Sequence, residues 1–391
     1  MAAELYHGSK SRTLAYRYFF NPINRAIRSV RLKLKGVRED PAAVALVKRA
    51  EQLIAAGDVA AARTLVREAA DLSDRNPRVT TTFGVGSSLM CLGDCGRGLR
   101  LMAPHVKRGD TRTWTGQDLS DATLIVRQRI RSDMGAAVRL ARFIGDVQKS
   151  ARRCVVVAEG RLVPLFQRSF PGAEVVSMDA SLPRIEGKVY EAVLERVASF
   201  YATDWTSIET TFKPLKADDA VASTLRHKYR AAAQGPIIGI TWGSRNARKG
   251  MPDLDAWAHF VQNFPATFVS LQYGEVDAAV AKLTAGKAQK LIEDETVDQM
   301  KDMDRFAAQI MALDAVIGVS NTAAYLAGAL DVPLVVVRDD RFGMYPVEGD
   351  RTGWFPQGTL IRKRQRPWSE VLDEAAARLT QRVELRAKAQ S

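Results

Sequence analysis

Residues 315–337 read AVIGVSNTAAYLAGALDVPLVVV, and this stretch decides the class of fold. Its two ends are continuous apolar runs of strand length, which predict strands buried on both faces. The alanine-rich segment between them predicts a helix that lies close to the sheet, with Ser320, Asn321 and Thr322 able to cap its first turn. A helix that joins two such strands indicates a parallel α/β sheet.

The same pattern recurs in two sets along the chain. Short β-branched runs predict strands at 123–128, 154–158 and 174–178, and again at 237–242, 267–272, 315–319 and 334–338. Helices are expected between them, at 135–150, 253–264, 304–314 and 322–330. Residues 190–235 predict a less regular helical stretch that ends at Gly235-Pro236. The predicted fold class is therefore α/β, with two Rossmann-like doubly wound domains.

The segment before the first set predicts helical hairpins. Gly-Asp turns occur at Gly57 and Gly93, which are about one tetratricopeptide period of roughly 34 residues apart. We expect a short TPR-like helical region, which either packs on the next domain or offers a groove to a protein partner. The expected domains are a basic segment (1–39), the TPR-like region (40–108), a first Rossmann-like domain (109–234) and a second one with a carboxyl-terminal helix (235–391).

Composition limits the classes of function. The 57 Lys and Arg against 44 Asp and Glu give a net charge of +13, which favours anionic partners. The cysteines Cys91, Cys95 and Cys154 form neither an even disulfide set nor a zinc-binding spacing, so a reducing compartment is expected. The chain has no signal-peptide core and no apolar run of about 18 residues. We expect a cytoplasmic protein without a bound metal.

Residues 16–35 combine an apolar helical stripe with a basic face. One interpretation is an amphipathic helix on an anionic membrane, which would make the protein peripheral at the inner membrane. The other is a helix packed on its own protein with its basic face in solvent. No nucleic-acid recognition motif accompanies the segment, so no specific nucleic-acid partner is expected.

Polar and basic side chains follow the strands of the second set, where open parallel sheets bind their ligands. After the strand 237–242, Gly243 and Ser244 permit close approach of a ligand. The same loop then supplies cations that can neutralise a diphosphate without a metal, namely Arg245, Arg248 and Lys249. A solvated surface loop is the alternative interpretation.

Two further turns add to this edge. Glu275, beyond the strand 267–272, can accept hydrogen bonds from ribose hydroxyls, although an exposed loop acid explains it equally well. The first-turn amides that follow Ser320 form an end that attracts phosphate. Every helix that follows a strand needs a cap, so this signal alone does not distinguish a ligand site from an ordinary turn.

In this order the motifs resemble a known family. ITWGS and RKGMPDLDAW, FVSLQYGE, residues 306–337 and W-x-E-V-L at 368–372 are similar to bacterial tetratricopeptide-repeat glycosyltransferase-like proteins. These are related to the lipopolysaccharide heptosyltransferases of glycosyltransferase family nine and, more distantly, to O-GlcNAc transferase. The resemblance covers about residues 110–380. It implies a GT-B fold, a nucleotide sugar held mainly by the carboxyl-terminal domain, an acceptor held by the other domain, and no cofactor besides the donor substrate.

The resemblance also implies roles for individual residues. Lys249 falls at a phosphate-binding lysine, Glu275 lies near a ribose-contacting acid, and residues 320–322 fall at a phosphate-cradling turn. The other residues expected at the donor site are Trp242, Gly243, Ser244, Arg245, Gln272, Tyr273 and Ala323.

The last of these motifs departs from the family pattern. The family has an acid where this chain has Ser320 and a histidine where it has Tyr325. Tyr325 is therefore expected to act as a neutral hydrogen-bond donor to the leaving diphosphate.

A second departure concerns the general base. Ala136 stands where the family has an aspartate that takes the acceptor proton, a role that typically contributes about 10²- to 10⁴-fold. Asp133 is the expected substitute, and Arg127 and Arg129 are expected to hold an anionic acceptor.

The predicted function is metal-independent, inverting transfer of a hexose or heptose from a nucleotide sugar to a glycan, lipid or protein, in cell-surface polysaccharide or glycoprotein biosynthesis. The alternative is a catalytically inactive scaffold that organises partners through its repeats, its basic segment or the aromatic loop 338–355. A nucleotide-sugar epimerase on the same fold is the third hypothesis.

Overall fold

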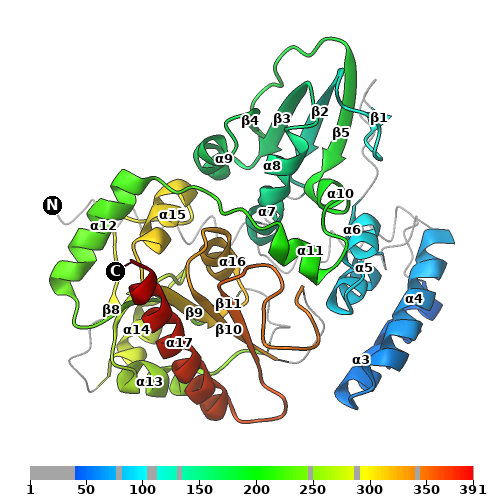
Figure 1. Cartoon of the computed structure of the whole chain (residues 1–391). Helices are drawn as coiled ribbons and strands as arrows, with labels where there is room; N and C mark the ends of the chain where they lie inside the picture. Colours follow the sequence, from blue (N-terminus) through cyan, green and yellow to red (C-terminus); the bar gives the residue numbers. More distant parts are fainter. Residues whose placement is uncertain are drawn as a thin grey trace.

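The computed structural model describes residues 40–75, 82–103, 112–129, 134–244, 250–285, 291–339 and 344–390. A helical region precedes two parallel sheets, each flanked by helices (Figure 1). The fold is thus mixed α/β with parallel sheets, as the sequence predicts. The basic segment 16–35 lies outside the described residues.

The helical region consists of two hairpins with the same turn. Each turn has a glycine in the left-handed region, Gly57 at φ 88° and Gly93 at φ 96°. The aspartate after each glycine donates its amide to a carbonyl of the preceding helix, Asp58 to Leu53 at 2.8 Å and Asp94 to Leu89 at 3.0 Å. The helices are α3 (Pro41–Ala55), α4 (Val59–Arg75), α5 (Thr82–Cys91) and α6 (Cys95–Met102). The tetratricopeptide assignment remains a prediction.

The first sheet has the order β1-β5-β2-β3-β4, and each of its neighbouring pairs is parallel. Three of its strands match the predicted runs. The prediction of an irregular helical stretch from residue 190 is wrong at its start, because β5 pairs there with β2. The strands are β1 (Arg112–Thr113), β2 (Ala122–Arg127), β3 (Arg153–Ala158), β4 (Ala173–Ser177) and β5 (Lys188–Val193).

The second sheet has the order β11-β10-β9-β6-β7-β8, again all parallel. Four predicted strands are confirmed, and the short β8 and the edge strand β11 are additional. Residues of β6 and β9 are all buried, which explains their continuous apolar sequences. The strands are β6 (Ile237–Thr241), β7 (Thr267–Ser270), β8 (Leu291–Ile292), β9 (Ala315–Val319), β10 (Leu334–Arg338) and β11 (Gly358–Arg362).

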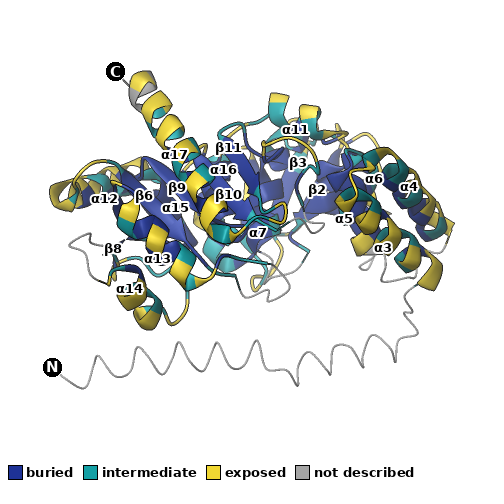
Figure 2. Ribbon diagram, turned by 90° about the horizontal axis from the view of Figure 1, so that it is seen from below, coloured by how far each residue is buried: buried dark blue, intermediate teal, exposed yellow. Residues whose placement is uncertain are grey.

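Helices cover both sheets, so the strands lie buried between them (Figure 2). The helices and short 3-10 turns around the first sheet are α7 (Met134–Leu140), η1 (Ala141–Phe143), α8 (Ile144–Val147), η2 (Gly160–Leu162), α9 (Val163–Ser169), α10 (Leu194–Ala198) and α11 (Trp205–Thr210). Those around the second are α12 (Asp219–Ala232), α13 (Leu254–Asn263), α14 (Asp277–Leu283), α15 (Met303–Met311), α16 (Thr322–Ala329) and α17 (Trp368–Gln390). Although α12 precedes the second sheet in sequence, it packs on α15, and α17 packs on α13 and β10.

Three aromatic side chains of the loop 338–355 lie in the core, whereas Phe342 lies outside the described residues. Tyr345, Trp354 and Phe355 are at most 2% exposed. Trp354 packs edge-on against Trp205 with ring centroids 5.2 Å apart, and Phe355 packs against Phe212 at 6.2 Å. These three rings are therefore unavailable to a protein partner.

None of the helices in the described part of the chain combines the length and apolarity that crossing a bilayer requires. The three cysteines are buried and form no disulfide within the described residues. Burial raises the pKa of the Cys154 thiol to about 12, which keeps this side chain protonated and unreactive at neutral pH.

Candidate functional site

The carboxyl ends of β6, β7 and β9 are joined by side-chain hydrogen bonds. Asn321 donates to Thr241 Oγ1 and to the carbonyl of Gly243, the latter at 3.0 Å. Gln272 Oε1 accepts from Thr241 Oγ1 at 3.1 Å and from the Gly243 amide at 2.8 Å. Gly318 permits this approach, because a Cβ there would lie 2.3 Å from Thr241 Cγ2. The network fixes three strand ends relative to one another.

Asn321 also begins α16. Its backbone is extended (φ −145°, ψ −174°), and its side-chain oxygen accepts from the Ala324 amide at 3.1 Å, which is the geometry of an N-cap. Within the described residues, no acceptor is bonded to the amides of Thr322 or Ala323. The helix start therefore has main-chain donors that the protein leaves unpaired.

Hydroxyl groups and rings gather beside this helix start. The Tyr325 hydroxyl lies 3.0 Å from Ser320 Oγ, and the Tyr345 hydroxyl donates to the same oxygen at 3.3 Å. The two tyrosine rings stack with centroids 6.0 Å apart. Burial raises the pKa of Tyr345 well above its ordinary value, and the neighbouring Tyr325 raises it further, so this phenol stays neutral.

A buried cation lies against the same rings. The Arg139 guanidinium is 4.7 Å from the ring centroids of both Tyr325 and Trp354. Arg139 is only 6% exposed, and its Nε has no hydrogen-bond partner among the described residues. Arg338 lies over the Tyr345 ring at 5.5 Å. Positive charge is thus held near the start of α16.

The two halves of the molecule meet at α16. Helix α7, which follows β2 in the first half, packs against it. A Cβ at Gly135 would lie 3.0 Å from Tyr325 Cδ2 and 3.7 Å from Thr322 Oγ1. The first turn of α7 therefore borders the predicted donor site.

The other residues predicted at the donor site differ in how exposed they are. Trp242 is buried in the core behind the strand end, whereas Glu275 is exposed beyond β7. Ser244 and Tyr273 are partly exposed at the same edge, and Ala323 is buried in α16. Arg245, Arg248 and Lys249 lie outside the described residues, as does Asp133.

The arginines predicted to hold an acceptor are paired with glutamates that the sequence analysis missed. Arg127 in β2 bonds to Glu191 in β5. Arg129 Nε donates to Glu195 Oε1 at 2.6 Å. Glu191 and Glu195 are 1% and 5% exposed, so both ion pairs are largely desolvated. The sequence around the two acids favours a helix, whereas Glu191 lies in β5 and Glu195 in the first turn of α10.

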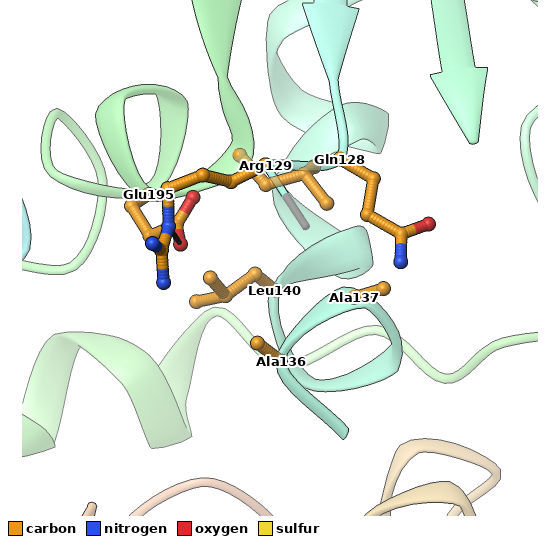
Figure 3. Close-up of a pocket in the computed structure, with 7 residues that line it drawn as sticks. Gln128, Arg129, Ala136, Ala137, Leu140 and Glu195 are labelled. Carbon is orange, nitrogen blue, oxygen red and sulfur yellow. Dashed lines mark hydrogen bonds and ion pairs between the residues drawn. The ribbon is translucent and has the colours of Figure 1, made fainter. Parts of the chain in front are cut away.

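One of these pairs lines a small pocket that has room for about one water molecule and is partly open to solvent. Figure 3 shows Glu195 and Arg129 on one side and residues of α7 on the other. Glu195 Oε2 is buried and has no hydrogen-bond partner among the described residues. The lining residues are Gln128, Arg129, Ala136, Ala137, Leu140, Leu194 and Glu195.

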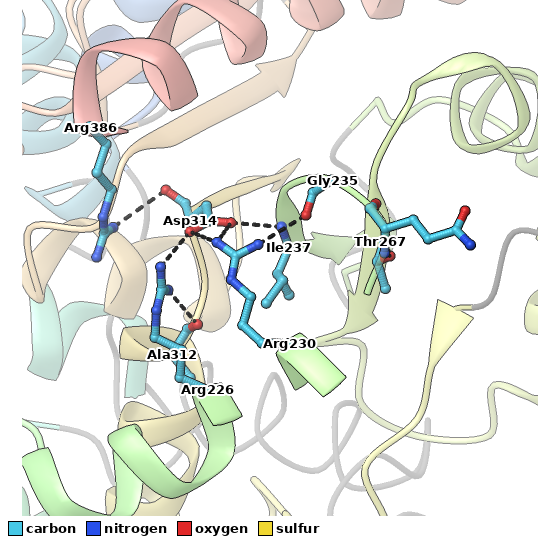
Figure 4. A network of polar contacts seen from close by, with 9 residues as sticks. Arg226, Arg230, Gly235, Ile237, Thr267, Ala312, Asp314 and Arg386 are labelled. Atoms are coloured by element: carbon cyan, nitrogen blue, oxygen red, sulfur yellow. Dashed lines mark hydrogen bonds and ion pairs between the residues drawn. The ribbon is translucent and has the colours of Figure 1, made fainter. Parts of the chain in front are cut away.

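At the opposite edge of the second sheet lies a buried acid whose two oxygens both accept hydrogen bonds. Asp314, just before β9, accepts from Arg226 and Arg230 and from the amide of Ile237 (Figure 4). The Arg386 side chain of α17 donates to the Asp314 carbonyl at 3.4 Å. This cluster joins α12 and α17 to the sheet and leaves both carboxylate oxygens occupied.

No protein-family model matches the chain. Among curated proteins it is 26% identical over 247 residues to Protein FlbA of Caulobacter vibrioides, an alignment that covers 57% of this chain. The chain spans only 40% of the length of that relative.

The solved structures that match the chain include two glycosyltransferases, both with a TM-score below 0.5. One is a glycosyl transferase family 9 protein from Veillonella parvula, with 10% identity, a TM-score of 0.47 and coverage of 68% of this chain and 98% of that one. Another is the ADP-heptose LPS heptosyltransferase II of E. coli, with 14% identity, a TM-score of 0.47 and coverage of 66% and 99%. An O-GlcNAc transferase mutant from Thermobaculum terrenum matches with 15% identity, a TM-score of 0.33 and coverage of 90% and 81%.

Proposed function

We propose that the chain binds a nucleotide sugar at the carboxyl edge of the second sheet and transfers the sugar, with inversion and without a metal, to a hydroxyl acceptor. The observation that carries the proposal is the pair of amides at Thr322 and Ala323, to which no acceptor among the described residues is bonded. They belong to a capped helix start, the type of end that binds phosphate. The motif resemblance to glycosyltransferases supports the same site.

Cations at this edge complete the proposed diphosphate site. Arg139 is buried over the Tyr325 ring with an unpartnered Nε. Arg245 and Lys249 follow β6 in the sequence and are proposed to reach the phosphates from their loop. Charge from three such groups would neutralise a departing diphosphate.

Neutral groups are proposed to orient the donor. The Tyr325 hydroxyl, which lies 3.0 Å from Ser320 Oγ, is proposed to donate a hydrogen bond to the leaving diphosphate. Glu275 is exposed beyond β7, where a ribose extending from the diphosphate would meet it. The acceptor would approach from the first half, across α7.

Calorimetric titration with ADP-, UDP- and GDP-linked sugars, with and without EDTA, tests the proposal. Binding of one class with EDTA present is expected, and Lys249→Ala is expected to weaken it by about tenfold or more, the loss of one charge-assisted contact. Lys301→Ala removes an exposed lysine of the same charge and serves as the control. No binding by any of the sugars contradicts the proposal.

A catalytically inactive scaffold is the second candidate. The observation that favours it is the close packing of Gly135 against Tyr325, which brings the two halves into contact beside the proposed phosphate site. A scaffold predicts that none of the nucleotide sugars binds and that Lys249→Ala changes nothing.

A further inference from the structure

Glu195 combines deep burial with an unused oxygen. The residue is 5% exposed, and Arg129 bonds to Oε1 only. Oε2 is buried without a hydrogen-bond partner among the described residues. Leaving a buried acceptor unsatisfied costs about 1–3 kcal/mol, so such a group points to a ligand that completes it.

The space for that ligand is next to the carboxylate. Glu195 lines the pocket together with Ala136, Ala137 and Leu140 of α7 (Figure 3). Small side chains on this face of α7 leave the pocket open, and Arg129 keeps a positive charge beside the acid. Arg129 also lies 5.2 Å from the Phe83 ring of α5, so the helical region contacts one of the residues that line the pocket.

Helix α7 contributes residues both to the pocket and to the border of the proposed donor site. Ala136 lines the pocket, and its neighbour Gly135 packs against Tyr325 and Thr322 at the start of α16. Arg139, one turn further along α7, covers the Tyr325 ring. Residues 135 and 139 share one face of α7, so an acceptor hydroxyl in the pocket would lie on the face next to the one that borders a donor held at α16.

We infer that Glu195 is the general base of the proposed transfer. Oε2 takes the proton of the acceptor hydroxyl as that oxygen forms a bond to the anomeric carbon. The bond from this carbon to the phosphate oxygen breaks, and the nucleoside diphosphate leaves with the electron pair. The glutamic acid then returns its proton to solvent. This inference rests on the proposed function and assigns the acceptor side of the same reaction.

Glu195→Gln tests it with almost no change of shape. The assay is release of nucleoside diphosphate from the bound nucleotide sugar with water as acceptor, alongside donor affinity by calorimetry. We expect kcat to fall about 10²- to 10⁴-fold while the donor Kd stays within about twofold, because a base acts only on the chemical step. Formate should restore part of the rate of Glu195→Ala.

Glu191→Gln is the matched control. Glu191 is an equally buried glutamate paired with Arg127 at the same sheet, but it does not line the pocket. It should alter stability and leave the rate of diphosphate release unchanged.

The outcomes separate the two proposals. If no nucleotide sugar binds, the proposed function fails and this inference fails with it. If the wild type releases diphosphate and Glu195→Gln turns over like it, only the role of Glu195 is wrong. If the donor binds but the wild type releases no diphosphate, the proposed transfer step is wrong as well. If Asp133→Asn abolishes turnover while Glu195→Gln does not, the base is Asp133, as the sequence predicted.

Discussion

Asp314 and Glu195 are both buried acids beside arginines, yet their hydrogen bonding differs. Asp314 is 7% exposed, and its two oxygens accept from two arginines and a main-chain amide. Glu195 is 5% exposed, and one of its oxygens has no partner among the described residues. The acid at the amino edge of the second sheet is complete and joins helices to strands. Glu195, which follows a strand of the first sheet, keeps one oxygen without a partner among the described residues and lines a pocket.

The difference separates residues that stabilise the fold from residues that await a ligand. Breaking a complete cluster should cost stability, whereas changing an incomplete group should cost activity. Measuring the free energy of unfolding and the affinity for the donor on the same variants therefore tests this difference.

The largest effect is expected for Asp314→Ala. The substitution leaves Arg226 and Arg230 without their acid and the Ile237 amide unbonded, so the free energy of unfolding should fall by about 3 kcal/mol. Urea denaturation measures it. Donor affinity of the folded protein should be unchanged, because the cluster lies at the edge opposite to the proposed site.

Asp255→Ala is the control for this substitution, since Asp255 is 80% exposed in its pair with Lys282 and should contribute less than about 1 kcal/mol. A loss for Asp314→Ala no larger than that of the control would remove the basis of the comparison.

A smaller effect is expected for Gly318→Ala, which should change both the free energy of unfolding and the affinity for the donor. The added methyl would lie 2.3 Å from Thr241 Cγ2 and 2.4 Å from the Thr241 carbonyl, so β6 and β9 must separate. We expect a loss of about 2 kcal/mol in the free energy of unfolding and weaker donor binding, because Thr241 anchors Asn321.

Gly84→Ala is the matched control for the glycine substitution. The site has no atom within 4 Å of the added Cβ, and helix propensity should make the change neutral or stabilising by about 0.5–1 kcal/mol. Equal effects at both glycines would show that packing at the strand ends is not tight.

The smallest effect concerns Asp294, a second complete acid. Burial raises its pKa, but hydrogen bonds from Lys228, Thr296 and Tyr229 outweigh this and lower the pKa from 3.8 to about 2. The stabilisation is therefore present above about pH 4 and is lost as the pH falls through about 2.

Asp294→Asn should reduce the free energy of unfolding by about 1 kcal/mol at pH 7, since solvent around the half-exposed Lys228 screens the pair. Denaturation curves from pH 7 down to pH 2 should show the wild type and variant converging. A difference that stays constant with pH would mean that the carboxylate charge contributes nothing.

Much of the fold could be predicted because its strands are continuous apolar runs. The strand β5 could not, since KVYEAV leads directly into LERVA, and its Glu, Ala and Leu favour a helix. Pairing with β2 overrides that local preference. The edge strand β11 was missed because it follows an aromatic loop that resembles a surface but packs in the core.

The residues of the candidate site also differ in whether the sequence points to them. Ser320, Asn321 and Tyr325 were found because they lie together in sequence after a strand. Glu195 was not, because its partner Arg129 is distant in the chain and only the β2–β5 pairing brings them together. Local patterns thus predict the proposed phosphate end of the candidate site, whereas only the tertiary structure points to Glu195.

The central claim is that the unpaired amides of Thr322 and Ala323 hold a diphosphate. Crystals soaked with ADP, UDP or GDP test it most directly. The account predicts phosphate oxygens about 3 Å from these two amide nitrogens, with the nucleoside extending toward Glu275. A nucleotide bound elsewhere, or the same amides bonded to protein atoms in crystals that take up no nucleotide, would contradict it.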